Sequence, residues 1–156
     1  AMTLSMTFGT PLAQYGVIRG IDLEVAQKAG LYSARHTAQG LMPDPNGDLV
    51  VLPYAKGKSA KYRNIQTGEW FQTKGGNKTM WLRDHCEACN QIIITDGDWD
   101  ALAAMSAGLP GVMSIPEGAP SETGRKAYPA IDDAADLLAA ADKIILAVDN
   151  EAAGSA

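Results

Sequence analysis

Two apolar stretches of the sequence each end in carboxylates. Ile92-Ile93-Ile94-Thr95 leads directly into Asp96, and a second stretch over residues 143–148 leads into Asp149 and, two residues on, Glu151. Continuous apolar runs of this kind predict strands buried on both faces, as in a parallel sheet covered by helices. The carboxyl ends of such strands lie at one edge of the sheet, where ligands bind. We therefore expect these acids to meet there as candidate metal-binding or phosphate-handling groups.

The elements that must position these acids alternate regularly along the second half of the chain. The pattern predicts helices over residues 98–107 and 131–141, with a further strand over 112–115 between them. The order strand, helix, strand, helix, strand is typical of a doubly wound sheet with right-handed crossovers and helices on both faces. Because the chain stops shortly after Asp149, we expect this sheet to be truncated at its C-terminus.

The first half of the chain has a different pattern. A helix is expected between Asp22 as its N-cap and Gly30 at its end, and Asn46-Gly47 is typical of a hairpin turn before a strand. The alternating segment 61–65 predicts another strand. We therefore expect an α/β chain in which an α+β N-terminal lobe, residues 1–88, precedes a Rossmann-like, mostly parallel sheet domain, residues 89–156.

Charge is divided unevenly along a chain whose formal net charge is −5. Residues 51–83 hold seven basic side chains and one acid, whereas residues 84–156 hold thirteen acids and three bases. This asymmetry suits a site that holds a polyanion on one wall and divalent cations on the other. The alternative is a lysine-rich hairpin with an ordinary solvated face, and charge alone does not decide between the two.

Composition narrows the class of protein. With 156 residues, 46% of them hydrophobic and 20% charged, the chain is typical of a globular protein with one ordinary core or two small lobes. No apolar run approaches the roughly 20 residues that cross a bilayer, and residues 1–20 lack a signal-peptide pattern. We therefore expect no membrane partner and a cytoplasmic location. Cys86 and Cys89 form a single Cys-x-x-Cys pair, only half of a structural zinc site, which favours ordinary reduced thiols.

Four segments resemble one protein family, in the family's order and spacing. Residues 93–102 resemble the first Toprim motif of bacteriophage primase-helicases and the related mitochondrial helicases, and residues 149–154, Asp-x-Glu-x-x-Gly, resemble the second. Residues 114–119 are similar to the Ser-Leu-Pro-Asn-Gly-Ala segment that lies between these motifs in the family. Residues 61–63, together with 19–22 and the Asn46-Gly47 turn, resemble the basic subdomain that precedes Toprim. The resemblance implies a Toprim-like domain over residues 89–156.

The resemblance also implies a function, a fragment of a DNA primase catalytic core that makes short RNA primers on single-stranded DNA by metal-dependent nucleotidyl transfer. It implies Mg²⁺ or Mn²⁺ as cofactor. Asp96, Asp149 and Glu151 are the implied catalytic residues and, with Asp100, the implied metal ligands. The implied partners are the DNA template, ribonucleoside triphosphates and a replicative helicase, either fused or separate.

Two of these acids differ from the family pattern. Asp96 stands where the family has Glu, and Glu151 stands where it has the second Asp. Each change moves a carboxylate by about one carbon–carbon bond, roughly 1.5 Å, while Mg²⁺ demands near-octahedral ligands at about 2.1 Å. Because the two changes run in opposite directions, our hypothesis is that one compensates the other. Asp100 falls in the first turn of the expected helix, which favours a cap or a contact to a metal-bound water over direct ligation.

Basic side chains of the N-terminal lobe are the candidates for nucleotide or DNA binding: Lys56, Lys58, Lys61, Arg63 and Lys74. Lys61 and Arg63, two apart on one strand, are expected on the same face. Trp70 and Phe71 are candidates for stacking on a base, although an adjacent aromatic pair usually places one ring in the core. His36 has no acid or nucleophile at a telling spacing, so we expect a structural role for it.

Three other functions fit parts of the pattern. One is a Toprim module that binds nucleic acid without activity because its altered acids no longer hold metal productively. Another is a Toprim-type nuclease or topoisomerase-like enzyme, although none of the five tyrosines is in a context that indicates a nucleophile. The last is a generic Mg²⁺-dependent phosphotransfer protein, which leaves the basic lobe without a reason.

Overall fold

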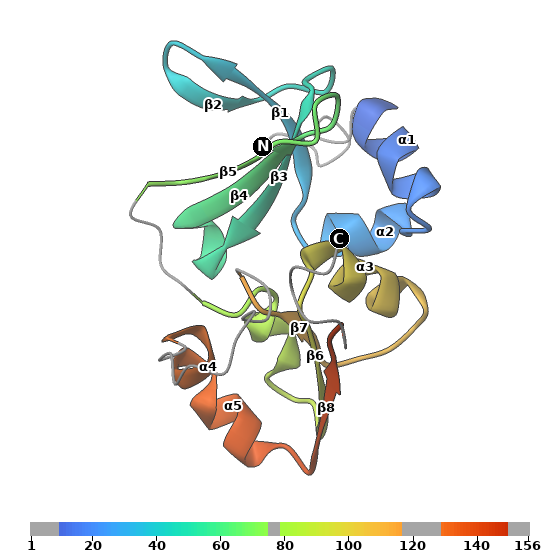
Figure 1. Ribbon diagram of the computed structural model, residues 1–156, viewed down its shortest axis with the longest axis vertical. Helices are drawn as coiled ribbons and strands as arrows, with labels where there is room; N and C mark the ends of the chain where they lie inside the picture. The colour runs from blue at the N-terminus through green and yellow to red at the C-terminus, as the bar shows by residue number, and fades with distance from the viewer. Residues whose placement is uncertain (1–9, 75–78, 117–128, 150–156) are drawn as a thin grey trace. The chain divides into compact units, whose positions relative to one another are not determined.

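The computed structural model describes residues 10–74, 79–116 and 129–149. The chain forms two compact units, residues 1–77 and residues 78–156. Each unit has its own sheet, antiparallel in the first and parallel in the second (Figure 1). The mixed α/β class expected from the sequence is confirmed.

In its described residues, the first unit contains two α-helices and a five-stranded antiparallel sheet with strand order β2-β1-β3-β4-β5 (Figure 1). The helices are α1 (Thr10–Ile18) and α2 (Leu23–Lys28). The strands are β1 (Tyr32–Thr37), β2 (Gly40–Pro43), β3 (Leu49–Tyr54), β4 (Ser59–Asn64) and β5 (Trp70–Gln72). The expected combination of a helix and a small antiparallel sheet is confirmed, and α1 is an element that the sequence pattern did not indicate.

Helix α2 begins and ends where its capping residues predict. The Asp22 carboxylate accepts a hydrogen bond of 2.9 Å from the backbone N–H of Glu24, which satisfies one of the free donors of the first turn. Gly30 follows the last turn with φ +84°, a left-handed conformation that glycine adopts without strain.

The Asn46-Gly47 turn is not a hairpin, and this expectation is wrong. Strands β2 and β3, which flank it, each pair with β1 and not with each other. Asp44 starts a turn instead, because its side chain accepts from the N–H of Asn46 and its carbonyl from that of Gly47. A Cβ on Gly47 would overlap the carbonyl of Ala34, so close backbone approach explains the glycine.

The second unit contains a three-stranded parallel sheet with strand order β7-β6-β8. Its strands are β6 (Gln91–Thr95), β7 (Val112–Ser114) and β8 (Lys143–Ala147), and its helices are α3 (Asp98–Ser106), α4 (Pro129–Asp133) and α5 (Ala135–Ala140). The three strands and the first helix agree with the sequence pattern. The helix expected over residues 131–141 is two short helices that meet at Ala134.

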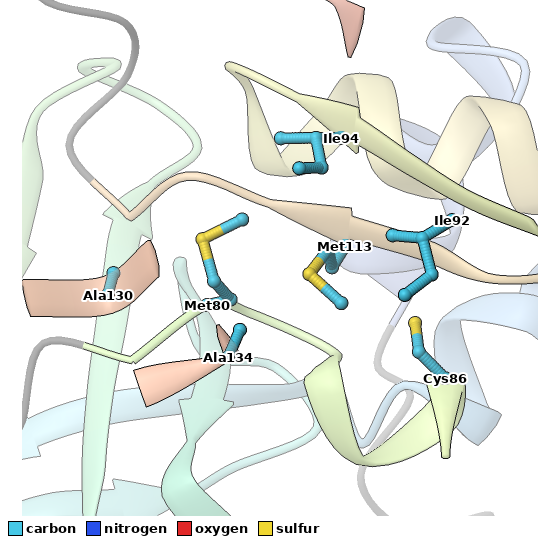
Figure 2. Packing of buried hydrophobic residues seen from close by; sticks show 7 residues of the cluster. All are labelled: Met80, Cys86, Ile92, Ile94, Met113, Ala130 and Ala134. Atoms are coloured by element: carbon cyan, nitrogen blue, oxygen red, sulfur yellow. The ribbon is translucent and has the colours of Figure 1, made fainter. Parts of the chain in front are cut away.

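The two faces of β6 pack against different helices, as two-residue alternation requires. Ile92 and Ile94 face the α4–α5 side, while α3 packs on the other side of β6 and β7. Figure 2 shows the cluster on the α4–α5 side, which consists of Met80, Cys86, Ile92, Ile94, Met113, Ala130 and Ala134. The helices therefore cover both faces of the parallel sheet, as expected.

The segment before β6 belongs to the same core. Met80 and Cys86 are each 1% exposed within this cluster, and Trp81 exchanges backbone hydrogen bonds with Ser114 at the free edge of β7. Packing therefore assigns residues from 79 onward to the second unit, while the domain boundary expected between residues 88 and 89 stays a prediction. None of the helices in the described ranges is long and apolar enough to cross a membrane.

Candidate active site

Strands β6 and β8 bring two of the expected acids to one corner of the parallel sheet. The strands are neighbours, with Thr95 opposite Ala147 at their carboxyl ends. Just beyond this pair, the backbone N–H of Asp149 donates a hydrogen bond to Oδ2 of Asp96, with an N-to-O distance of 3.3 Å. The Asp149 side chain is exposed and that of Asp96 is half-buried, so both carboxylates lie where a ligand can reach them.

The loop that carries Asp96 is held from both sides. The hydroxyl of Thr95 donates to the carbonyl of Gly97 over 3.0 Å, and the carbonyl of Thr95 accepts from the N–H of Ile115 over 2.9 Å. Thr95 itself is 3% exposed. A short polar turn with its ends fixed in this way presents Asp96 in one orientation, as a ligand-binding residue requires.

Asp100 lies in the first turn of α3, where the sequence favours a capping role. Gly97 is the N-cap residue and has no side chain to cap the helix. The Asp100 carboxylate fills that space, because a Cβ added to Gly97 would overlap Oδ2 of Asp100. The position also places a negative charge near the positive end of the helix dipole. This first-turn position agrees with the sequence pattern, while the roles of Asp100 as cap or metal ligand stay predictions.

Asp98 is a buried acid for which the sequence indicates only a first-turn position. It is 4% exposed, and its Oδ1 accepts a hydrogen bond of 2.9 Å from the hydroxyl of Ser114 at the end of β7. The pair ties the start of α3 to the neighbouring strand, directly behind the Asp96 loop. Ser114 begins one of the motif segments, and its hydroxyl could have suggested a buried polar contact. The sequence alone does not show that Asp98 is the residue it contacts.

Glu151 lies outside the described residues, so the third expected ligand has no structural account. Across the three described ranges there is no group of three or more His, Cys, Asp or Glu side chains placed to hold a metal ion. Asp96 and Asp149 are the acids that the structure does bring together. Mg²⁺ in proteins is commonly held by one or two carboxylates plus substrate phosphates and water, so this pair fits the donor set of such an ion.

Lys61 and Arg63 of β4 share a face of the first unit, as expected. Both lie beside Trp70 on β5: the Lys61 Nζ and the Arg63 Cζ are each 5.3 Å from the centre of its ring. Arg63 also lies 5.7 Å from the ring centre of Tyr15 on α1. Within the described chain, its Nε is buried and has no hydrogen-bond partner. The arrangement is a basic and aromatic surface of the kind that binds nucleic acid.

The other three expected binding residues gather at one end of the same sheet. Lys56 and Lys58 lie in the turn between β3 and β4 and are exposed. Lys74 follows Thr73, whose N–H donates to the carbonyl of Ala60 at the start of β4. The topology therefore places these three lysines near one another and next to Lys61.

Arg83 has a different role from the bases that precede it. Its guanidinium bonds to Oδ2 of Asp133 at 2.6 Å and to Oδ1 of Asp136 at 3.3 Å. The hydrogen bond that Arg83 donates to the Asp133 carboxylate raises the pKa of Arg83 above its ordinary value. Its charge thus joins α4 and α5 to the segment before β6 and is not part of the basic surface.

The two cysteines are not bonded to each other in the structure. Cys86 lies in the core, and this burial raises the pKa of its thiol to about 12, with the charge of Cys89 adding to the effect. A thiol in this environment is a poor nucleophile and a poor metal ligand, because both roles need the thiolate.

Sequence comparison finds two plant relatives. The chain is 30% identical over 124 residues to the Twinkle homolog protein, chloroplastic/mitochondrial, of Arabidopsis thaliana, an alignment that covers 70% of this chain and 17% of that protein. It is 32% identical over 107 residues to the Primase homolog protein of the same plant, covering 63% of this chain and 32% of the relative. The chain thus spans a third or less of the length of each relative. No protein-family model matches it.

The fold has a solved counterpart in a phage protein. The primase fragment of the bacteriophage T7 primase-helicase superposes with a TM-score of 0.61 at 20% identity, covering 86% of this chain and 54% of that one. The match extends through both units, so it includes the antiparallel lobe as well as the Toprim-like sheet. In sequence and in fold, the chain therefore resembles the Toprim-domain primases of the phage primase-helicase and Twinkle-like group, as its motifs predict.

Proposed function

We propose that the chain is part of a DNA primase catalytic core, which makes short RNA primers on single-stranded DNA by metal-dependent nucleotidyl transfer. The observation that carries the proposal is the corner where Asp96 and Asp149 meet at the ends of adjacent parallel strands. The similarity to a Twinkle homolog and a primase homolog supports the choice of this reaction over other phosphoryl transfers.

The chemistry joins two ribonucleotides. A 3′-oxygen attacks an α-phosphate, a new P–O bond forms, and the bond to pyrophosphate breaks. Asp96 and Asp149, together with Glu151, would hold Mg²⁺ or Mn²⁺, and such an ion stabilises the charge that develops on the attacking and leaving oxygens. Asp96 lies on the more protected side of the corner, which also makes it the candidate to accept the proton of the 3′-hydroxyl.

The residues around this corner supply rigidity. Thr95 and the Asp98–Ser114 pair hold the loop that carries Asp96, and Asp100 occupies the space over Gly97 at the start of α3. Each of these contacts restricts where the Asp96 carboxylate can move. Positioning of this kind matters because a catalytic group displaced by about 1 Å can lose a factor of about 100 in rate.

The basic surface would bind the template strand and the incoming nucleotides. Lys61 and Arg63 offer positive charge beside the Trp70 ring. Lys56, Lys58 and Lys74 extend the positive charge to the end of the sheet. Phosphate oxygens suit these donors because they combine negative charge with several acceptor positions.

A replicative helicase, fused or separate, is the protein partner that we propose, because the phage protein with the matching fold is a primase-helicase and one relative is a Twinkle homolog. We also propose a cytoplasmic location. Cys86 and Cys89 remain thiols in the structure although they are only three positions apart, which suits a reducing compartment.

One observation favours a second candidate, a nucleic-acid-binding Toprim module without activity. The described residues alone offer two acids at the corner, and two of the three expected acids differ from the family pattern by one methylene. If the altered acids do not hold metal, the basic surface of the first unit would still bind DNA.

Template-dependent incorporation of labelled ribonucleotides separates these two functions. The longest protein that contains this chain, here called the parent, is assayed on single-stranded DNA with Mg²⁺ or Mn²⁺. The same protein with Asp149→Asn is assayed alongside it. Asp142→Asn is the matched control, because Asp142 is exposed and lies just before β8, at the opposite end of that strand from Asp149. Primers from the parent and Asp142→Asn, with none from Asp149→Asn, are expected. Absence of primers from the parent, with DNA binding intact, would contradict primase activity and favour the binding module.

A further inference from the structure

The first unit contains a pocket on the sheet face opposite Lys61 and Arg63. Its volume is about 460 Å³, within the range of about 300–1,000 Å³ that is typical of small-molecule sites. Its walls come from β1, β4 and β5, and Leu49 at the start of β3 forms its floor. Tyr62 and Asn64 alternate with Lys61 and Arg63 along β4, which places the pocket on the other face of the sheet.

The strand register explains why the sheet is hollow here. Strand β3 begins at Leu49, which lies opposite Ala34 on β1 and Asn64 on β4. Beyond Ala34, β1 continues without β3 as a neighbour and pairs only with β2. The pocket lies where the pairing of β1 with β3 ends, and His36 and Tyr62 both line it.

Three aromatic rings line one side of the pocket. Tyr62 and Phe71 are directly paired across β4 and β5, and their rings stack with centres 5.3 Å apart and planes within 16°. The His36 ring lies 6.4 Å from Tyr62 at an angle of 42°. Phe71 is 42% exposed, although large apolar side chains are normally buried. A flat apolar ligand is what such a row of rings accommodates, and base–aromatic stacking is tolerant of sequence.

The polar groups of the pocket select for hydrogen-bond donors. The Oδ1 of Asn64 accepts from the N–H groups of Gln66 and Thr67, which fixes the amide so that its Nδ2 points to Oδ2 of Asp48 at 3.3 Å. The Asp48 carboxylate keeps further acceptor positions, since each oxygen has two lone pairs. An occupant that presents N–H groups, such as an exocyclic amine, satisfies them.

The charge of the pocket disfavours phosphate as its occupant. Arg35 is the basic residue of the lining, and its Nε is paired with Oδ2 of Asp44 at 2.9 Å. Asp48 adds a negative charge, and the lysines and Arg63 lie outside the lining. Aromatic rings with an unneutralised carboxylate suit the base of a nucleotide and not its phosphate.

We propose that this pocket binds one unstacked base of single-stranded nucleic acid, with a preference for bases that carry an exocyclic amine over thymine or uracil. The proposal rests on the proposed function, which supplies the single strand. Strand β5 forms one edge of the sheet, and its adjacent residues Trp70 and Phe71 are 41% and 42% exposed. A single strand of nucleic acid that crosses this edge would meet the basic surface on one face of the sheet and the pocket on the other face.

The test measures binding of dye-labelled (dC)10, (dA)10 and (dT)10 to the 156-residue chain by fluorescence anisotropy, without ribonucleotides or divalent metal. Phe71→Ala is expected to lower the affinity for (dC)10 and (dA)10 at least about fivefold, since stacking on an aromatic ring contributes on that scale. Asp48→Asn is expected to remove the preference over (dT)10 while leaving (dT)10 binding unchanged. Ile18→Ala, at an 82% exposed apolar residue of α1, is the control and should bind as the parent does.

A second measurement does not depend on how the variants fold. Titration of the unaltered chain with dCMP, followed by proton NMR, is expected to shift the ring resonances of His36 and Tyr62 upfield through stacking, with a smaller effect from dTMP. Equal affinities for the three oligonucleotides in folded Phe71→Ala and the parent, or no ring shifts with dCMP, would overturn the pocket. Because neither assay involves synthesis, loss of primase activity in the parent would contradict the proposed function and leave these results interpretable.

Discussion

The backbone N–H of Asp149 donates to the carboxylate of Asp96, two residues that are 53 positions apart in the sequence. This contact fixes the ends of β6 and β8 at one corner of the sheet. It also means that the Asp96 carboxylate is oriented by the backbone of the strand that carries the other acid. A change in the length of the Asp96 side chain therefore moves its carboxylate relative to the backbone at Asp149, which leads to the first prediction.

Asp96→Glu and Glu151→Asp, made singly, are each expected to lower primer synthesis at least about tenfold. Each substitution moves one carboxylate by roughly 1.5 Å without adjusting the other. The double variant should recover most of the parental rate, because it restores the pattern of acids found in the family. Initial rates at saturating Mg²⁺ measure this. A double variant that is as poor as the product of the two single losses would show that the acids do not compensate each other.

Gly97→Ala is expected to destabilise the second unit by about 0.3–1 kcal/mol, the value of a carboxylate's interaction with the start of a helix, because the exposed Asp100 carboxylate must turn away. The new methyl group would occupy the position of the Asp100 carboxylate and push it away from the start of α3. Urea unfolding followed by circular dichroism measures the change.

Asp100→Ala provides the matched test of that explanation. In the double variant Gly97→Ala with Asp100→Ala the overlap is gone, so adding Gly97→Ala to Asp100→Ala should cost little. If Gly97→Ala costs as much in the absence of Asp100 as in its presence, the overlap is not the cause.

The buried pair of Asp98 and Ser114 is expected to show strong coupling. Asp98→Ala removes the acceptor of a buried hydroxyl and should lower the free energy of unfolding by about 1–3 kcal/mol, whereas Asp98→Asn keeps an acceptor oxygen and should cost less. The variant Asp98→Ala with Ser114→Ala should lose less than the sum of the two single changes. Exposed Asp132→Ala serves as the control. Strict additivity in this cycle would argue against the hydrogen bond.

Stability should fall with rising pH because of Cys86. Burial raises the pKa of this thiol from 9.0 to about 12, so between these values the unfolded chain has lost a proton that the folded chain keeps. Stability from this group is therefore complete below pH 9 and is lost as the pH rises toward 12, by at most about 1.4 kcal/mol per unit. Urea unfolding at pH 8 and pH 9.8 measures the slope. Cys86→Ala should reduce it strongly and Cys89→Ala only slightly, because the charge of Cys89 is the smaller cause of the raised pKa. Equal slopes in all three proteins would contradict this account.

The sequence predicted the parallel sheet well because its strands are short, apolar and bounded by strong signals. Residues 92–95 are followed directly by Asp96 and Gly97. Helix α3 is followed by Gly108, whose φ of +86° is a left-handed conformation that glycine adopts without strain. The acids that directly follow two such strands then predicted that Asp96 and Asp149 share an edge. Such local and periodic patterns predict most of the topology of the second unit.

Long-range pairing is what the sequence could not supply. Asn46-Gly47 has the local pattern of a hairpin turn, yet its flanking strands are separated by β1, and only tertiary contacts decide that order. Helix α1 has no acid in its first turn and no base in its last, so its ends carry no charge signal. The partnership of Asp98 with Ser114 arises from the packing of α3 on β7, and the pocket beside Leu49 lies where β1 and β3 stop pairing; no short segment encodes either.

In the proposed function the corner of β6 and β8 holds a divalent ion, and Mn²⁺ binding followed by electron paramagnetic resonance tests this most directly. We expect the parent chain to bind Mn²⁺, with affinity lowered at least about tenfold in Asp96→Asn and in Asp149→Asn and unchanged in Asp142→Asn. Competition by Mg²⁺ should displace the bound ion. Mn²⁺ binding that is the same in all four proteins, or that is absent from the parent, would contradict the account.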